Sequence, residues 1–348
     1  ALELNKKTIQ YNVLKRESEG NRKLFDVLLN RLKETSLTEG MEFNNIRILD
    51  YAQVPTSPVR PDKQKMLLLA ALVGILGGCG LALFMEYLDD RIKTESDVEQ
   101  YLGLPFLGTI PAISGEEKES LYMIAEKMPK AMVSEAFRGL RTSVLFSSSD
   151  KEISTIMLTS GGPGEGKTTV AINLAVTMAH EGKKVLLIDC DLRRPTLHKV
   201  FGLNDKLGLS NLLVDHSIEI DKAIHETEVA NLDIILCGPI PPNPSELLGS
   251  KRMKEIISIL DNKYDRVIFD SPPSISLADA AVLGRSVEGV LLVVDTKTTA
   301  RGKAQKSVKA LTEVGANLIG VALNRVNINE EGYYGYYYYN YDYGKDKG

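Results

Sequence analysis

A glycine-rich loop in the middle of the chain has the residue types that bind nucleotide phosphates. The pattern G-x-x-x-x-G-K-[ST] is satisfied in full by Gly161, Gly166, Lys167 and Thr168. Glycines let backbone N–H groups turn inward, the lysine ammonium reaches the outer phosphates, and the threonine hydroxyl can hold Mg²⁺. An apolar strand pattern precedes the loop and a helix pattern follows it, which is the context that the motif requires. The sequence therefore predicts a nucleotide site, since a plain glycine turn leaves Lys167 unexplained.

Carboxylates stand at the ends of two buried strand patterns further along the chain. Val185–Asp189 ends in Asp189 and is followed by Asp191, and Arg266–Asp270 ends in Asp270. An aspartate at a strand end commonly serves as a turn or helix-cap residue, and that alternative weighs most for Asp191. Clustered carboxylates repel one another unless a cation lies among them, so Mg²⁺ is their expected partner.

These residues require a scaffold, and the chain supplies one from about residue 131. Six apolar strand patterns follow, and helix patterns lie between most of them. The strand patterns are Thr155–Thr159, Val185–Asp189, Leu232–Leu236, Arg266–Asp270, Val290–Asp295 and Leu318–Leu323. Such alternation predicts an α/β fold with a doubly wound, mostly parallel sheet. The carboxyl ends of its strands are expected to carry the chemistry.

A long apolar stretch precedes this region. Met66–Met85 contains no charged residue and spans roughly 30 Å as a helix, one bilayer core. We predict a transmembrane helix over 63–88, the alternative being a buried helix of a soluble protein. A count of lysines and arginines would place the side before the helix in the cytoplasm, but the difference is small. We give more weight to the nucleotide loop, which needs cytoplasmic ATP.

The N-terminal part has a different character. Residues 3–35 predict a long polar helix whose heptad stripe is interrupted at Ser18 and Asn21, so a coiled coil and a helix packed on one side both remain open. A short strand is expected at Asn45–Ala52, and the prolines of Val54–Pro61 indicate a stiff extended connector. The chain begins with Ala rather than Met, which is typical of a fragment.

Composition narrows the possible functions. The 348 residues suffice for about two domains, and 43% hydrophobic with 25% charged residues is typical of a folded protein. A net charge of −4 gives no general reason to expect nucleic acid as a partner. The three cysteines form no C-x-x-C pair, so neither a zinc site nor a disulfide framework is indicated.

Two further clusters stand out at either end of the α/β region. On a helix, Glu135, Arg138 and Arg141 would share roughly one face, either as a solvated ion-paired surface or as a contact between subunits. The C-terminal segment lacks the aliphatic residues needed for a core, so we expect a mobile tail. Its eight tyrosines, which are potential phosphate acceptors, are Tyr333, Tyr334, Tyr336, Tyr337, Tyr338, Tyr339, Tyr341 and Tyr343.

Taken together, these features resemble the bacterial tyrosine kinases that are attached to polysaccharide co-polymerases. In chain order, the resemblance is carried by E-x-x-R-x-x-R at Glu135–Arg141, Walker A at Gly161–Thr168, Walker A′ at Asp189–Arg193, Walker B at Asp270–Pro273, and the tyrosine cluster. The fused members of the family carry a first membrane helix and a large extracytoplasmic domain, and this sequence resembles only the end of that domain, as expected of a fragment. Unlike ParA- and MinD-type ATPases of the same fold, it has Ser160 rather than lysine before the loop glycines.

The resemblance implies a P-loop NTPase fold and an ATP- and Mg²⁺-dependent tyrosine autokinase. Lys167, Asp189, Asp191 and Asp270 would be catalytic: Asp189 would be the base for the tyrosine hydroxyl, and Asp191 would assist the metal or the substrate. Mg²⁺ would be held by Thr168, Asp189 and Asp270. Asn324 and Arg325 would border the adenine, and the phosphates would be bound by Gly161, Gly162, Gly164, Glu165, Gly166, Lys167, Thr168 and Thr169.

The resemblance also implies an organisation and a set of partners. The expected parts are 1–62, the end of an extracytoplasmic domain; 63–88, the membrane helix; 89–130, a juxtamembrane linker; 131–330, a cytoplasmic kinase domain; and 331–348, the tail. Glu135, Arg138 and Arg141 would join subunits into a ring in the bacterial inner membrane, and phosphorylated tails would loosen it. A polysaccharide polymerase or export machinery and a tyrosine phosphatase would be partners. A MinD- or ParA-like ATPase switch and a non-catalytic chain-length scaffold are the alternatives, but neither needs the tyrosine tail.

Overall fold

A computed structural model describes residues 2–39, 50–51, 53–54, 60–113, 122–148, 152–204, 206–275 and 278–327. The chain divides into two compact units, Ala1–Gly80 and Leu81–Gly348, which we describe separately. Most of the expected strand at Asn45–Ala52, residues 55–59 of the proline connector and the whole tyrosine cluster lie outside the described residues.

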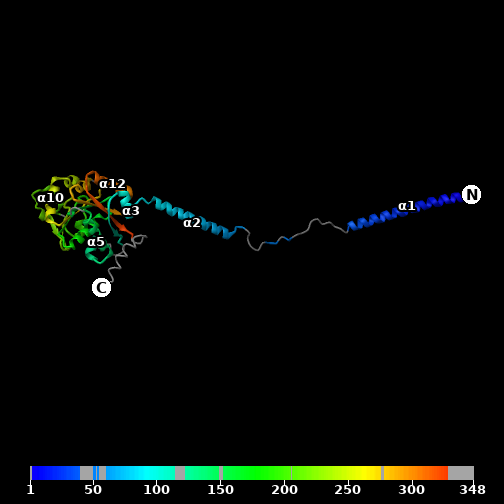
Figure 1. Ribbon diagram of the computed structural model, residues 1–348, viewed down its shortest axis with the longest axis horizontal. Helices are drawn as coiled ribbons and strands as arrows, with labels where there is room; N and C mark the ends of the chain where they lie inside the picture. The colour runs from blue at the N-terminus through cyan, green and yellow to red at the C-terminus, as the bar shows by residue number, and fades with distance from the viewer. Residues whose placement is uncertain are drawn as a thin grey trace. The chain divides into compact units, whose positions relative to one another are not determined.

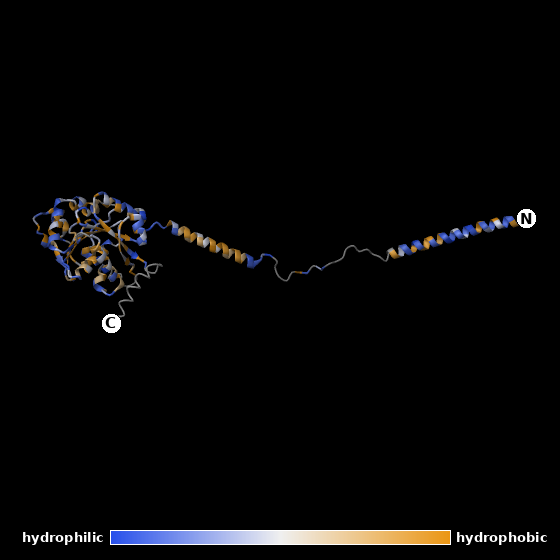
Figure 2. Ribbon diagram, viewed as in Figure 1, coloured by the Kyte–Doolittle hydropathy of each residue, from blue (hydrophilic) through white to orange (hydrophobic). Residues whose placement is uncertain are grey.

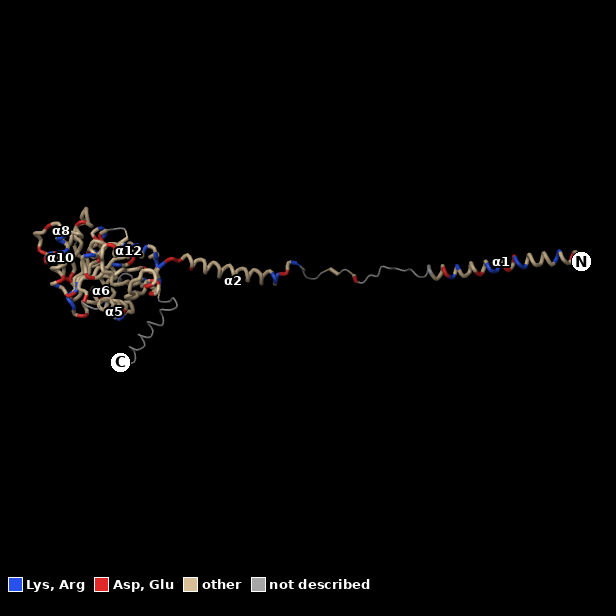
Figure 3. The backbone as a smooth tube through the Cα atoms, turned by 45° about the horizontal axis from the view of Figure 1, so that its top comes forward, with Lys and Arg blue, Asp and Glu red and all other residues tan. Residues whose placement is uncertain are grey.

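The first unit contains a long exposed helix, α1 (Leu2–Glu39), which confirms the helix predicted over 3–35. Charged residues of both signs lie along it (Figure 3). Its apolar side chains are exposed, among them Tyr11 and Leu14, each at 65%. Whether these residues pack in a coiled coil or on one side only remains a prediction.

Helix α2 (Lys63–Leu88) is apolar along nearly all of its length, with charged residues near its ends (Figures 2 and 3). Its most apolar window has a mean hydropathy of 2.5, and none of that window is buried. Its 26 residues rise about 39 Å at 1.5 Å per residue, more than the bilayer core. The helix is therefore long and apolar enough to cross a membrane.

The second unit is built on an eight-stranded sheet in the order β1-β8-β7-β2-β6-β3-β5-β4. Every pairing is parallel except that of β4 with β5. All six predicted strands are present, with ends shifted by at most three residues. The strands are β1 (Phe106–Pro111), β2 (Thr155–Ser160), β3 (Val185–Asp189), β4 (Ile224–Glu226), β5 (Leu232–Ile235), β6 (Arg266–Asp270), β7 (Gly289–Asp295) and β8 (Leu318–Val326).

Helices cover both faces of this sheet, as the doubly wound prediction requires (Figure 1). Alternate strand residues face opposite layers, so that Leu187 packs in one core and its neighbours Leu186 and Ile188 in the other. One layer holds α4 (Ile124–Lys127), α5 (Met132–Leu145), α6 (Lys167–Ala179) and α7 (Leu197–Phe201). The other holds the π-helical turn η1 (Val98–Leu102), α8 (Leu209–Val214), α9 (Pro244–Leu248), α10 (Lys251–Lys263), α11 (Ala278–Gly284) and α12 (Arg301–Glu313). Two further short helices of the described residues are α3 (Glu95–Asp97) and η3 (Ile220–Ala223).

The structure corrects the expectation that residues 89–130 form a linker before the sheet. Strand β1 pairs in parallel with β8, and Ile92 and Val98 are fully buried beside β7 and β8. The boundary expected at residue 131 therefore falls between β1 and the helix that covers it. The strand escapes detection because it lies at the sheet edge, is only partly buried and ends in proline. Strand β4, also unpredicted, has three residues at the opposite edge.

Candidate active site

The glycine loop joins β2, in the middle of the sheet, to α6, which begins at Lys167. Gly164 and Gly166 have φ angles of 80° and 90°, a left-handed backbone that side chains disfavour. A Cβ at Gly166 would also lie 2.1 Å from Nδ2 of Asn324. Glycine is therefore required there both by the backbone angle and by the close approach of β8.

Four predicted site residues meet at the end of the loop. Nζ of Lys167 lies 3.1 Å from Oδ2 of Asp191 and 3.2 Å from Oδ1 of Asp270. The hydroxyl of Thr168 donates to Oδ2 of Asp270 at 2.6 Å. Asp189 is the Cα partner of Asp270 in the pairing of β3 with β6, which brings the third carboxylate to the same edge.

Burial and crowding shift the pKa values of these groups. Burial, followed by the charge of Asp270, raises the pKa of Asp189 to about 7. Burial also raises the pKa of Asp270, although the Lys167 ammonium opposes it. Burial alone would lower the pKa of Lys167, but Asp270 and Asp191 outweigh it and raise that pKa. Three carboxylates thus share one ammonium. The negative charge of the site therefore exceeds its positive charge and favours the binding of a further cation.

Asp189 also has a structural role. Its Oδ2 accepts the N–H groups of Thr196 and Leu197 at 3.0 and 3.1 Å, at the start of α7, and its Oδ1 accepts the N–H of Asp191. Asp191 in turn accepts the N–H of Arg194 at 3.0 Å. These are the hydrogen bonds expected of aspartates that act as turn or helix-cap residues. They hold the loop after β3 around the carboxylate cluster.

A cavity of about 1200 Å³ opens in front of the cluster. Its lining includes Gly164, Gly166, Lys167, Thr168, Thr169, Asp191, Arg193, Arg194, Lys297, Asn324 and Arg325. The lining does not include Asp189, Asp270, Glu165, Gly161 or Gly162. Asp189 and Asp270 therefore stay predicted metal ligands, and Asp189 a predicted base, without direct exposure to the cavity. The loop backbone is the remaining route by which Glu165 could contact a phosphate.

The residues fit Mg²⁺ together with a polyphosphate. Oγ1 of Thr168 and Oδ2 of Asp270 are hard oxygens 2.6 Å apart, and the excess of carboxylates over ammonium favours a cation. Among the described residues, no group of three or more His, Cys, Asp or Glu side chains could hold a metal by itself. Mg²⁺ usually keeps several waters and takes few protein ligands.

Asn324 and Arg325 follow the last strand and line the cavity as well. Nδ2 of Asn324 donates to the carbonyl of Glu165 at 2.8 Å and so fastens the loop to β8. Arg325, at φ 58°, donates through Nη1 to Oδ2 of the fully buried Asp295 at 2.8 Å. Their predicted place beside an adenine remains a prediction.

Three residues around the site were not identified from the sequence. Asp295 ends β7 as Asp189 ends β3, so the strand-end pattern could have found it. Asp279, on α11, binds Arg193 at 2.7 Å, and Lys303, on α12, binds Glu165 at 2.6 Å. No local pattern marks these two, since their partners lie 86 and 138 residues away.

The predicted oligomerisation residues lie on α5 and do not line the cavity themselves, although Phe137 of the same helix does. Arg138 pairs with Glu135 and donates to the carbonyl of Pro129 at 2.6 Å. Arg141 donates to the carbonyl of Thr177 at 2.9 Å, which ties α5 to α6. Glu135 remains 59% exposed, and the role of the set in assembly stays a prediction.

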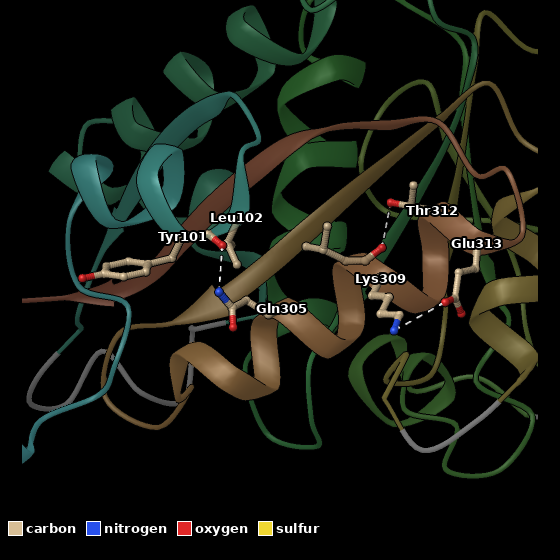
Figure 4. Close-up of a pocket in the computed structure, with 7 residues that line it drawn as sticks. Tyr101, Leu102, Gln305, Lys309, Thr312 and Glu313 are labelled. Atoms are coloured by element: carbon tan, nitrogen blue, oxygen red, sulfur yellow. Dashed lines mark hydrogen bonds and ion pairs between the residues drawn. The ribbon is translucent and has the colours of Figure 1, made fainter.

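A second hollow of about 410 Å³ lies between η1 and α12 (Figure 4). Nε2 of Gln305 donates to the carbonyl of Tyr101 across it, and Lys309 pairs with Glu313 at its other end. It shares no residue with the larger cavity and has no clustered carboxylates. The larger cavity is therefore the candidate active site.

Two family models match the chain. Residues 152–319 match an AAA domain, and residues 7–87 match a G-rich domain on putative tyrosine kinase. The tyrosine-protein kinase YwqD of Bacillus subtilis is 43% identical over 215 residues, which are 62% of this chain and 90% of that protein. The putative tyrosine-protein kinase EpsB of Ralstonia solanacearum is 34% identical over 340 residues, 95% of this chain. The chain spans about half of the length of EpsB, since the match covers 45% of it.

A solved structure agrees with these matches. The kinase domain of the Escherichia coli tyrosine kinase ETK is 33% identical and superposes with a TM-score of 0.64. The superposition covers 69% of this chain and 97% of that domain. The likeness thus extends over nearly the whole of the solved kinase domain.

Proposed function

Because this chain belongs to the bacterial tyrosine-protein kinases, we propose that it transfers the γ-phosphoryl group of ATP to tyrosines of its own C-terminal cluster. The observation that carries the proposal is the meeting of Lys167, Thr168 and Asp270 at the end of the phosphate loop, beside two further carboxylates. A turn or cap role for the aspartates would not require the lysine among them.

The side chains divide the work of phosphoryl transfer between them. The loop N–H groups and Lys167 hold and neutralise the phosphates, and Thr168 and Asp270 hold the metal. Mg²⁺ supplies charge neutralisation for the transferring group. The tyrosine oxygen bonds to the γ-phosphorus as the bond to ADP breaks, and Asp189 accepts the phenolic proton. Burial and the charge of Asp270 raise the pKa of Asp189 above that of an ordinary aspartate, which makes its carboxylate a stronger proton acceptor.

The acceptor tyrosines would come from a neighbouring copy. Tyr333–Tyr343 follow β8, whose end borders the cavity, and Glu135 with Arg138 offers an exposed charged pair for contact between subunits. We further propose a ring in the inner membrane with the kinase unit in the cytoplasm, where ATP is available. Tails carrying about −1.5 to −2 charges per phosphate would repel one another, loosen the ring and thereby regulate polysaccharide polymerisation and export. A tyrosine phosphatase would reset the tails.

An anti-phosphotyrosine blot of the purified chain with Mg·ATP tests the activity. We expect a signal in the wild type and in Lys309→Met, an exposed lysine of α12, and none in Lys167→Met. ATP hydrolysis without phosphotyrosine would instead indicate an ATPase switch.

A mixing experiment tests transfer between copies. Lys167→Met chains, which keep their tyrosines, are combined with active chains ending at residue 330. We expect phosphotyrosine on the Lys167→Met chains. Its absence, with active full-length chains as the control, would contradict transfer to a neighbour.

The proposed base has a test of its own. Asp189→Asn keeps the size of the side chain but cannot take the phenolic proton, and its amide NH₂ group would face a backbone N–H that the carboxylate accepts. Thermal unfolding of the variant therefore serves as the control for the fold. We expect transfer to fall on the order of a hundredfold, the usual contribution of general base catalysis. Transfer at the wild-type rate would remove Asp189 from this role.

A further inference from the structure

A carboxylate is buried inside the loop that is proposed to bind phosphate. The side chain of Glu165 has no exposed surface. Its Oε1 accepts a hydrogen bond from Lys303 at 2.6 Å, and its Oε2 has no hydrogen-bond partner among the described residues. One ammonium is therefore the main compensation for this buried charge.

Lys303 reaches the loop from the first turn of α12. Its Nζ lies so close to the loop that a Cβ on Gly162 would be 2.0 Å from it. The lysine side chain is 30% exposed, so its stem runs from the surface of α12 to a carboxylate that water does not reach. Glycine at position 162 is what leaves room for the ammonium.

The ion pair between Lys303 and Glu165 offsets a negative charge that would be unfavourable within the loop. A loop that gathers N–H groups around phosphates gains affinity from positive potential, and a carboxylate buried in the same loop opposes it. Removing one partner of a buried ion pair leaves the other charge uncompensated. An unpaired Glu165 would thus repel the phosphates from within the loop.

We propose that Lys303 is a positioning residue that neutralises Glu165 and thereby keeps the loop able to bind a polyphosphate. The inference rests on the proposed nucleotide site and adds to it a residue outside the Walker motifs. It has a specific consequence: loss of Lys303 penalises ligands according to their phosphate charge, whereas a general loosening of the fold weakens all nucleotides alike.

Calorimetric titration of the full chain with Mg·ADP and with Mg·AMP-PNP tests the proposal. For Lys303→Met we expect the Kd for Mg·ADP to rise on the order of tenfold, as expected for one uncompensated charge near the phosphates. The Kd for Mg·AMP-PNP, which carries a further phosphate group, is expected to rise more. Lys309→Met, on the same helix and paired with exposed Glu313, serves as the matched control with wild-type affinity.

A second substitution separates charge from support of the fold. Glu165→Gln removes the buried charge, so Lys303→Met combined with Glu165→Gln is expected to bind close to Glu165→Gln alone. A double variant as weak as Lys303→Met, or a Lys303→Met chain with wild-type affinities, overturns the proposal and leaves the nucleotide site intact. A wild-type chain that does not bind Mg·ADP refutes the proposed function itself, and this inference with it.

Discussion

Replacing Asp279 by asparagine should loosen an arginine at the edge of the cavity. Asp279 is 1% exposed on α11 and accepts two hydrogen bonds from Arg193, at 2.7 and 3.3 Å, and one from Ser245. Asparagine keeps the shape but removes the charge, and its amide N–H groups face donors. Because Arg193 lines the cavity, the substitution should affect both stability and phosphoryl transfer.

The size of the stability effect follows from the exposure of the partners. A hydrogen bond to a charged group contributes about 1.5–3 kcal/mol when it is buried. The Arg193 side chain is 41% exposed, so solvent screens the pair and we expect a loss of about 1–2 kcal/mol. For a unit of this size that lowers the Tm by about 4 °C.

The contribution of Asp279 to stability depends on pH in a definite direction. Burial alone would raise the pKa of Asp279, but the hydrogen bonds from Arg193 and Ser245 outweigh it and hold that pKa below its ordinary 3.8. A group whose pKa is lowered by folding contributes stability above its unfolded pKa and loses it as the pH falls through its folded pKa. The difference in Tm between wild type and variant should therefore be equal at pH 5 and pH 7 and shrink below about pH 4.

Thermal unfolding followed by circular dichroism measures these differences, with Arg193→Met as the matched background. If the pair is the cause, Asp279→Asn should cost at least about 1 kcal/mol less in Arg193→Met than in the wild type. Equal costs in both backgrounds, or a Tm difference that grows in acid, would refute the reasoning.

Three further substitutions test other parts of the structure. Gly162→Ala places a Cβ where the Lys303 ammonium lies and should raise the Kd for Mg·ADP on the order of tenfold, measured by calorimetry; unchanged affinity would contradict the contact. Phe137→Ala empties a site that is 1% exposed between α5 and the sheet, and should cost about 3–5 kcal/mol in urea unfolding. Gly320→Ala, at φ 154° and with its Cβ 2.6 Å from the carbonyl oxygen of Pro105, should cost about 1–3 kcal/mol in the same assay. An unchanged midpoint for either of the last two would contradict the packing described.

The elements that could be predicted are those whose burial or chemistry is visible in their own residue types. Strands such as Val185–Asp189 are buried on both faces and therefore appear as continuous apolar runs. The loop at Gly161–Thr168 carries its chemistry in its residue types. By contrast, β1 has one strand neighbour and a mixed pattern, so its membership in the sheet depends on β8, more than 200 residues away.

The contacts of the site were predictable only in part. That Asp189 and Asp270 lie at one edge follows from parallel strands, but their direct adjacency depends on the order β2-β6-β3, which periodicity does not encode. Lys303 illustrates the limit further. In the sequence it is one of three lysines on its helix, and only the placement of α12 over the loop pairs it with a buried carboxylate.

Long-range contacts also connect the segment after the apolar helix to the nucleotide loop. Strand β1 covers the edge of β8, and β8 supplies Asn324, whose amide fastens the loop at Glu165. Asp90 accepts the N–H of Arg301 at 2.7 Å, and Lys303, two residues on, reaches the same glutamate from α12. Both supports of Glu165 thus rest on residues 89–113. That stretch belongs physically to the catalytic unit, and a sequence boundary placed at 131 separates the loop from what holds it.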